Sequence, residues 1–270
     1  KRGLGEPRGR VGGRGGRGGL SRVWGVEGRG SDAENGEANG GSRQHRCRLI
    51  ALIRGSERGA SRLDAQIRVG GDAGASEVVV LRMHGPLAAH GDSVVTPLLL
   101  PDAPVVAWWP QNAPPDVAAS PIGAMAQRRV TDAAEARSPR AEMQRRADSY
   151  RPGDTDLAWT RLTLWRGLLA AALDQPPYEP VIAARVIGAS DSPSADLLAG
   201  WLAEALRCPV TLGRTTAGTG LVSVRLERHS GNIDIDRPDG AVATMTQTGQ
   251  PGRELNVARR GLVGCLADER

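Results

Sequence analysis

Residues 94–110 read VVTPLLLPDAPVVAWWP, two apolar runs separated by the tetrapeptide Pro-Asp-Ala-Pro. The second run, residues 105–109, is apolar on both faces and partly β-branched, which is typical of a strand buried on both sides in a parallel sheet covered by helices. Prolines flank this run, because a central strand cannot give up a backbone N–H. Successive side chains of a strand point to opposite faces. We therefore expect Trp108 and Trp109 to face different layers, one filling the core and the other meeting a helix, a ligand or a partner.

The segments around this strand have the pattern of an α/β unit. Residues 62–69, RLDAQIRV, alternate as a half-exposed edge strand does. Residues 77–83 predict a further strand, and residues 87–100 predict a helix that Pro97 would kink or end. Strand, helix and strand up to Trp109 then form a predicted βαβ unit with parallel strands.

The clearest helical pattern lies at residues 154–174. Its apolar residues recur at a spacing of three to four, which indicates one buried face. Asp154 or Thr155 is the expected N-cap, and Asp156 suits the positive first turn.

After residue 178 the pattern changes to that of an α+β unit. Residues 181–187 predict a strand, and Ser192-Pro193 predicts the start of a helix. Four short strands joined by tight turns then predict an antiparallel meander, at residues 210–212, 221–228, 232–236 and 241–246. The expected fold class is α/β, an N-terminal sheet unit containing βαβ, plus an α+β C-terminal unit with this meander. The expected domains are a disordered Gly/Arg-rich leader at 1–45, an α/β domain at 46–177 and an α+β domain at 178–270.

The net charge of +5 is confined to residues 1–46. Residues 1–46 hold 10 of the 35 basic and five of the 30 acidic residues, which leaves 25 of each for residues 47–270. The neutral body argues against capture of nucleic acid by charge. RNA binding by the RGGRGGRGG segment of the leader stays open as a minor alternative.

The composition favours a protein of the cytoplasm. No apolar run reaches the roughly 20 residues that a membrane helix needs, so no membrane contact is expected. Cys47, Cys208 and Cys265 are too few and too far apart for a disulfide framework or a CxxC metal site. The four histidines lack metal-ligand spacing, and neither a GxSxG nucleophile motif nor a P-loop is present. We therefore predict no catalytic residue, no metal and no cofactor.

The densest group of polar residues suggests a recognition site. It can grip an anionic ligand or the acidic surface of a partner through arginine forks framed by tryptophan. We favour the other interpretation of its side chains, in which they serve as interhelical ion pairs and helix caps. Together with Trp108 and Trp109, the candidate partner-binding residues are Arg128, Arg129, Asp132, Asp154, Asp156, Trp159 and Arg161.

Three segments carry a resemblance to a known family: PLLLPDAPVVAWWP (97–110), AQRRVTDAA (126–134) and GDTDLAWTRLTLWRGLLAAALD (153–174). RLDAQIRVGGDAG (62–74) and DSPSADLLAGWLAEAL (191–206) extend it. The sequence resembles the glucose-6-phosphate dehydrogenase assembly protein family, OpcA. The resemblance implies a non-catalytic cytoplasmic effector that binds glucose-6-phosphate dehydrogenase, promotes its active oligomer and raises flux into the oxidative pentose phosphate pathway. The resemblance assigns no catalytic residue to this sequence.

The leading hypothesis is therefore an assembly protein and allosteric activator of glucose-6-phosphate dehydrogenase. The alternative is an enzyme or sensor that binds a sugar phosphate through the region of Arg128 and Arg129. Binding of glucose 6-phosphate in the absence of the dehydrogenase would separate the two.

Overall fold

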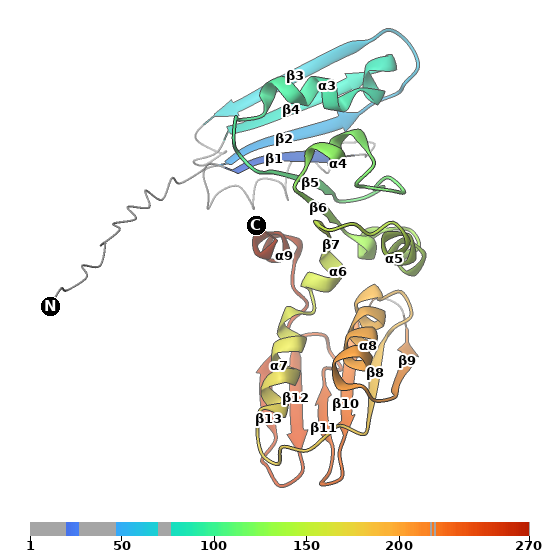
Figure 1. Ribbon diagram of the computed structural model, residues 1–270, viewed down its shortest axis with the longest axis vertical. Coiled ribbons are helices and arrows are strands. Elements are labelled where there is room, and N and C mark those ends of the chain that lie inside the picture. The colour runs from blue at the N-terminus through green and yellow to red at the C-terminus, as the bar shows by residue number, and fades with distance from the viewer. Residues whose placement is uncertain (1–19, 27–46, 70–76, 217, 219, 270) are drawn as a thin grey trace, which may run out of the picture.

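The computed structural model describes residues 20–26, 47–216, 218 and 220–269, except 70–76. Of residues 20–26 and of Cys47 it describes the backbone alone. Two β-sheets lie at opposite ends of an elongated molecule, and short helices fill the junction between them (Figure 1).

The first sheet has seven strands in the order β3-β4-β2-β1-β5-β6-β7. Its strands run parallel except at the edge, where β3 pairs antiparallel with β4. This confirms the prediction that residues 62–69 form an edge strand. The strands are β1 (Leu20–Val26), β2 (Cys47–Arg54), β3 (Arg62–Val69), β4 (Glu77–His84), β5 (Val105–Trp109), β6 (Arg128–Thr131) and β7 (Asp154–Asp156).

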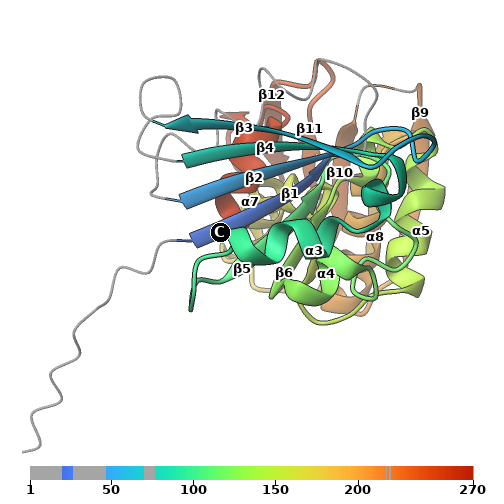
Figure 2. The same ribbon diagram turned by 90° about the horizontal axis from the view of Figure 1, so that it is seen from above.

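The two tryptophans of β5 face opposite layers, as the alternation of a strand requires. Trp109 packs with Leu81, Met83 and Ala88 on the face that carries α3 (Gly91–Val95) and α4 (Pro121–Met125), visible in Figure 2. Trp108 packs on the other face, with residues of α6 (Leu157–Thr160) and α9 (Leu262–Asp268). The rings are only 4% (Trp108) and 6% (Trp109) exposed, so both belong to the core.

Strand β1 corrects the expectation of a fully disordered leader. Leu20–Val26 pair parallel with β2 on one side and β5 on the other, at the centre of the sheet. The expectation of disorder was therefore wrong for these seven residues. The rest of the leader, with its RGGRGGRGG segment, lies outside the described residues.

The predicted helix at residues 87–100 is broken into three short pieces. Helix α3 is flanked by 3-10 turns at Gly85–Ala89 and Thr96–Leu98, each with a proline at its start. Pro97 accounts for the end of α3, because it has no N–H to donate within a continuous helix. Strands β4 and β5 are parallel as predicted, but β2 and β1 lie between them.

The predicted helix at residues 154–174 is a strand followed by two helices. Asp154–Asp156 pair with β6 as strand β7, and α6 and α7 (Thr163–Leu173) follow. The N-cap is Asp156, whose side chain accepts a hydrogen bond from the backbone N–H of Ala158. Asp154 and Thr155 were therefore wrong as caps, because pairing with β6 holds them in the sheet.

The second sheet has six strands in the order β13-β12-β11-β10-β8-β9. Strands β10 to β12 form three strands of the predicted antiparallel meander, and β13, which was not predicted, extends it. Strand β9 pairs parallel with β8 across the connecting helix α8. The expectation that residues 210–212 belong to the meander was wrong. The elements are β8 (Ala183–Ala189), α8 (Pro193–Leu206), β9 (Val210–Thr215), β10 (Leu221–Glu227), β11 (Ile233–Asp236), β12 (Val242–Gln247) and β13 (Arg253–Asn256).

Two helices connect the halves of the molecule. Helix α7 packs through Trp165 and Leu169 against the core of the second sheet. Helix α9 returns from the second sheet to the first, where Cys265 and Leu266 join the cluster around Trp108. This packing supports a unit boundary at about Asp156, which we propose in place of residue 177. A further short helix, α5 (Pro139–Asp148), lies at the junction.

Candidate functional site

A buried ion pair lies where the two halves meet. Asp132 follows β6, and Arg161 ends α6. The Arg161 guanidinium donates two hydrogen bonds to the Asp132 carboxylate, at 2.7 and 2.6 Å. The side chains are 8% (Arg161) and 1% (Asp132) exposed. A fork of this kind fixes both groups in one orientation.

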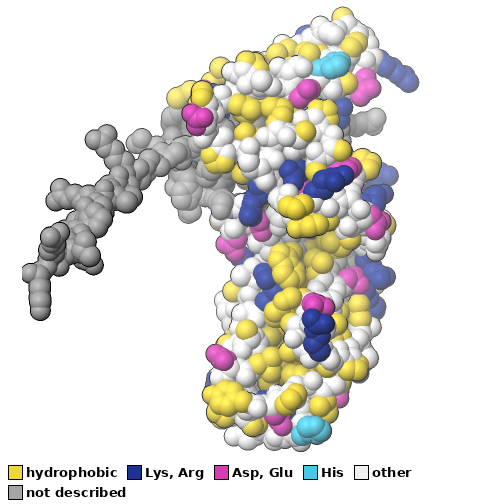
Figure 3. All heavy atoms as spheres, in the orientation of Figure 1, with side chains coloured by type: hydrophobic (Ala, Val, Ile, Leu, Met, Phe, Trp, Pro, Cys, Tyr) yellow, Lys and Arg dark blue, Asp and Glu magenta, His cyan; other side chains and the backbone are white. Residues whose placement is uncertain are grey.

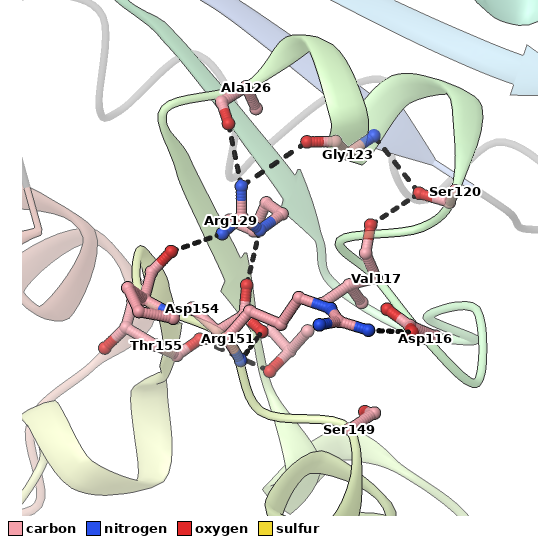
Figure 4. Close-up of polar contacts among 12 residues, drawn as sticks. Asp116, Val117, Ser120, Gly123, Ala126, Arg129, Ser149, Arg151, Asp154 and Thr155 are labelled. Atoms are coloured by element: carbon pink, nitrogen blue, oxygen red, sulfur yellow. Dashed lines mark hydrogen bonds and ion pairs between the residues drawn. The ribbon is translucent and has the colours of Figure 1, made fainter.

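Arg129 is the centre of a second buried network (Figure 4). Its guanidinium pairs with the Asp154 carboxylate and donates to the carbonyl oxygens of Ala126 at 2.8 Å and Pro152 at 2.7 Å. A longer contact of 3.5 Å reaches the carbonyl of Gly123. The fork of Arg129 therefore ties the end of α4 to β7 and has little capacity left for an external anion.

Asp156 organises the turn into α6. One carboxylate oxygen accepts from the Ala158 N–H at 2.9 Å. The other accepts from the Thr131 hydroxyl at 2.6 Å and the Ala133 N–H at 2.9 Å. Burial raises the pKa of Asp156, and the nearby Asp132 adds to the rise, while these three hydrogen bonds act in the opposite direction. The carboxylate thus holds β6, β7 and α6 together.

Arg128 and Trp159 are the accessible members of the predicted set. Arg128 is 47% exposed and forms an ion pair of 2.6 Å with Glu269, beyond the end of α9. Trp159 is partly buried, and the guanidinium of Arg166 lies 4.0 Å from the centre of its ring. Such a stack holds the ring in one orientation.

The structure brings most of the predicted site residues together. The polar residues gather around β6, β7 and α6, and Trp108 contacts the same region through the cluster that contains Leu157. Trp109 faces the layer of α3 and α4 instead. The sequence did not identify Glu269, because it lies 141 residues from Arg128 and carries no local pattern.

An apolar groove of about 530 Å³ opens beside this network. Figure 3 shows hydrophobic side chains across the middle of the molecule, where the two sheets meet. Tyr150, after α5, is 62% exposed at the groove. Sequence patterns missed this groove because its wall comes from α5, α6, α8 and the strands β6 and β7, which are separate in the chain. Its apolar lining residues include Val117, Met143, Ala147, Tyr150, Trp159 and Leu197.

The described part of the chain holds no cluster of three or more His, Cys, Asp or Glu side chains that could bind a metal ion. A search of the same residues found no helix with the length and apolar character needed to cross a membrane. Most candidate residues have structural partners, and the accessible feature of the site is an apolar groove with aromatic residues.

The fold and site define a two-sheet protein of mixed α and β structure, in which a buried polar network supports an exposed groove. Two sequence models of one family match the chain. The model for the N-terminal domain of a "Glucose-6-phosphate dehydrogenase subunit" matches residues 38–148. The model for the C-terminal domain of that same protein matches residues 152–269. The chain belongs to this family of glucose-6-phosphate dehydrogenase assembly proteins, OpcA, which confirms the resemblance.

A comparison with curated proteins found no match. An oxidoreductase from Sinorhizobium meliloti is similar in structure, with 10% identity, a TM-score of 0.47 and coverage of 88% of this chain and 78% of that chain. A dehydrogenase from Chromobacterium violaceum has 10% identity, a TM-score of 0.45 and coverage of 90% of this chain and 79% of that chain. Neither similarity is high enough to indicate a shared activity.

Proposed function

We propose that this protein is a non-catalytic assembly factor that binds glucose-6-phosphate dehydrogenase in the cytoplasm and promotes its active oligomer. The observation that carries the proposal is the match of both halves of the chain to the family of glucose-6-phosphate dehydrogenase assembly proteins. The buried network agrees with it, because Asp132, Asp154 and Asp156 are engaged by protein donors.

The activation follows from binding alone. A factor shifts an equilibrium between two forms of its partner only by the difference in its affinity for them. A surface that fits the active oligomer of the dehydrogenase better than its separated protomers raises the population of that oligomer. The protein then needs no catalytic group of its own.

The apolar groove between α5, α6 and α8 supports a docking role for this part of the molecule. Aromatic side chains at the centre of an interface carry a large share of binding energy. Tyr150 and Trp159 line the groove, and Arg128 is exposed in the same part of the molecule, at the start of β6. We propose that these side chains contact the dehydrogenase, whereas Trp108, Trp109, Arg129, Asp132 and Arg161 maintain the surface from within.

Purified protein and dehydrogenase test the proposal directly. The two are mixed, and their co-elution on size-exclusion chromatography is followed together with the rate of the dehydrogenase over a range of glucose 6-phosphate. We expect a complex, a larger dehydrogenase oligomer and a change in substrate saturation. Separate elution with unchanged kinetics would refute the proposal.

A further inference from the structure

A second cavity, of about 250 Å³, lies at the N-terminus of α8. Its wall combines the start of α8 with the turn between α6 and α7 and with loops of the second sheet. Three arginines contribute to the wall, against two acidic residues. The charged lining residues are Arg161, Arg237, Arg259, Glu135 and Asp191.

Arg237 is the unusual residue of this cavity. It is only 3% exposed, yet no carboxylate of the described residues lies within ion-pairing distance of it. Its guanidinium donates to the carbonyl oxygens of Val257, at 2.6 Å, and Leu221, and it lies 5.3 Å from the ring centre of Trp165. None of the described residues accepts a hydrogen bond from its Nε–H. A buried charge without a counter-ion is costly.

The surroundings of Arg237 increase that cost. Burial lowers the pKa of Arg237, and the positive charge of Arg259 lowers it further, while Asp239 opposes both effects. Arg161 is already neutralised by Asp132. Two arginines of the cavity wall, Arg237 and Arg259, therefore carry a positive charge that a bound anion would stabilise.

Helix α8 adds a partial positive charge to the same wall. It has 14 residues, and its N-cap Ser192 makes no side-chain cap hydrogen bond although it lines the cavity. The first residue of the helix, Pro193, has no backbone N–H, so an anion would be attracted by the N–H groups of the residues that follow it. The acid in its first turn, Asp196, does not line the cavity and pairs with Arg140 and Arg214.

The two acidic residues of the wall differ in their hydrogen bonds and in their exposure to solvent. Asp191 accepts the backbone N–H of Gly218 through both carboxylate oxygens, at 3.1 Å each. Glu135 is exposed to solvent. Neither forms an ion pair with Arg237 or Arg259 among the described residues.

We propose that this cavity binds the phosphate group of a small metabolite, between Arg237, Arg259 and the N-terminus of α8. The ligand must be small, because the volume of about 250 Å³ is below the range of drug-sized sites. The site is separate from the groove that contains Tyr150. Phosphate binding can therefore be measured in the absence of the dehydrogenase.

Isothermal titration calorimetry with inorganic phosphate tests the site on the full chain. Glycerol 3-phosphate and glycerol form a matched pair that differs in the phosphate group, and sodium chloride of equal ionic strength controls for screening. We expect binding of both phosphates and none of glycerol. Tighter binding of glycerol 3-phosphate than of inorganic phosphate would identify a phosphorylated metabolite as the ligand. No response beyond that of chloride would overturn the proposal.

Arginine variants distinguish phosphate binding at this site from a nonspecific effect of positive charge. Arg259→Ala removes an exposed arginine of the wall, and Arg253→Ala removes an exposed arginine of β13 that does not line the cavity. Hydrogen bonds to charged groups contribute about 1.5–3 kcal/mol, so we expect phosphate binding at least about 10-fold weaker in Arg259→Ala. Arg253→Ala keeps the affinity. Equal affinities in the two variants would overturn the proposal. Arg237→Lys keeps the positive charge but loses the forked guanidinium. We expect this variant to bind phosphate more weakly, while its circular dichroism spectrum stays unchanged.

Discussion

Arg161 and Asp132 form a buried two-bond ion pair that joins the loop after β6 to the end of α6. Removing one partner of such a pair leaves an uncompensated charge, which costs about 3–5 kcal/mol. We therefore expect Asp132→Ala to lower the free energy of unfolding by about that amount, measured by urea denaturation.

A double variant and a variant of an exposed ion pair serve as controls for this test. Asp132→Ala with Arg161→Met removes both charges and is expected to be more stable than Asp132→Ala alone. Glu204→Ala breaks the exposed pair between Glu204 and Arg207 and is expected to change stability little. A loss in Asp132→Ala no larger than that in Glu204→Ala would contradict the importance of the buried pair.

Trp108 and Trp109 are expected to stabilise the folded protein. Replacing a buried tryptophan by alanine costs about 3–5 kcal/mol, because it removes apolar contacts and leaves a cavity. Both Trp108→Ala and Trp109→Ala should therefore lower the midpoint of thermal unfolding. If Trp109→Ala abolished binding of the dehydrogenase and left the thermal midpoint unchanged, its assignment to the core would be wrong.

Two glycines are expected to respond in opposite ways to substitution by alanine. Gly153 has a φ of +97°, and an added Cβ would lie 2.6 Å from the carbonyl oxygen of Gln127, beside the Arg129 network. Gly200 lies in α8, where an added Cβ would meet no atom of the described residues within 4 Å outside its own stretch of helix. We expect Gly153→Ala to destabilise the protein and Gly200→Ala to stabilise it by about 0.4–1 kcal/mol. Urea denaturation of both variants measures whether each substitution lowers or raises the free energy of unfolding.

Cysteine labelling reports on the packing of α9. Burial raises the pKa of the Cys265 thiol, so a smaller fraction is thiolate at neutral pH, and its side chain has no exposed surface. Cys208 is partly exposed. In the native protein we expect an alkylating agent to modify Cys208 first, and Cys265 only on unfolding or well above neutral pH. Peptide mass spectrometry distinguishes the sites, and equal rates at neutral pH would contradict the packing of α9 on the first sheet.

Local patterns predicted the elements that are determined by their own residues. The apolar run of β5 and the alternation of β3 indicated a central and an edge strand, and both are found there. Residues 154–156 could not be predicted in the same way. Three polar residues resemble a helix cap, and only pairing with β6 makes them a strand. Strand β1 was hidden by the surrounding glycine-rich composition.

The sequence identified polar residues that lie together in the structure, but not how each of them is paired. The sequence identified Arg129, Asp132 and Arg161, and the ion-pair interpretation left open for them agrees with their contacts. Long-range packing determines which of them solvent can reach. It also creates the groove beside Tyr150 from segments that no local pattern connects.

The groove between α5, α6 and α8 is the surface through which we propose that this protein binds glucose-6-phosphate dehydrogenase. Tyr150→Ala and Tyr178→Ala form a matched pair, because both tyrosines are exposed, 62% and 77%, and only Tyr150 lines the groove. Sedimentation velocity of each variant mixed with the dehydrogenase measures the complex directly. We predict that Tyr150→Ala weakens the complex about 10-fold or more, as expected for an aromatic anchor, while Tyr178→Ala sediments as the unaltered protein does. A complex of equal stability with both variants would show that the dehydrogenase does not bind through this groove, and no complex with the unaltered protein would show that it does not bind at all.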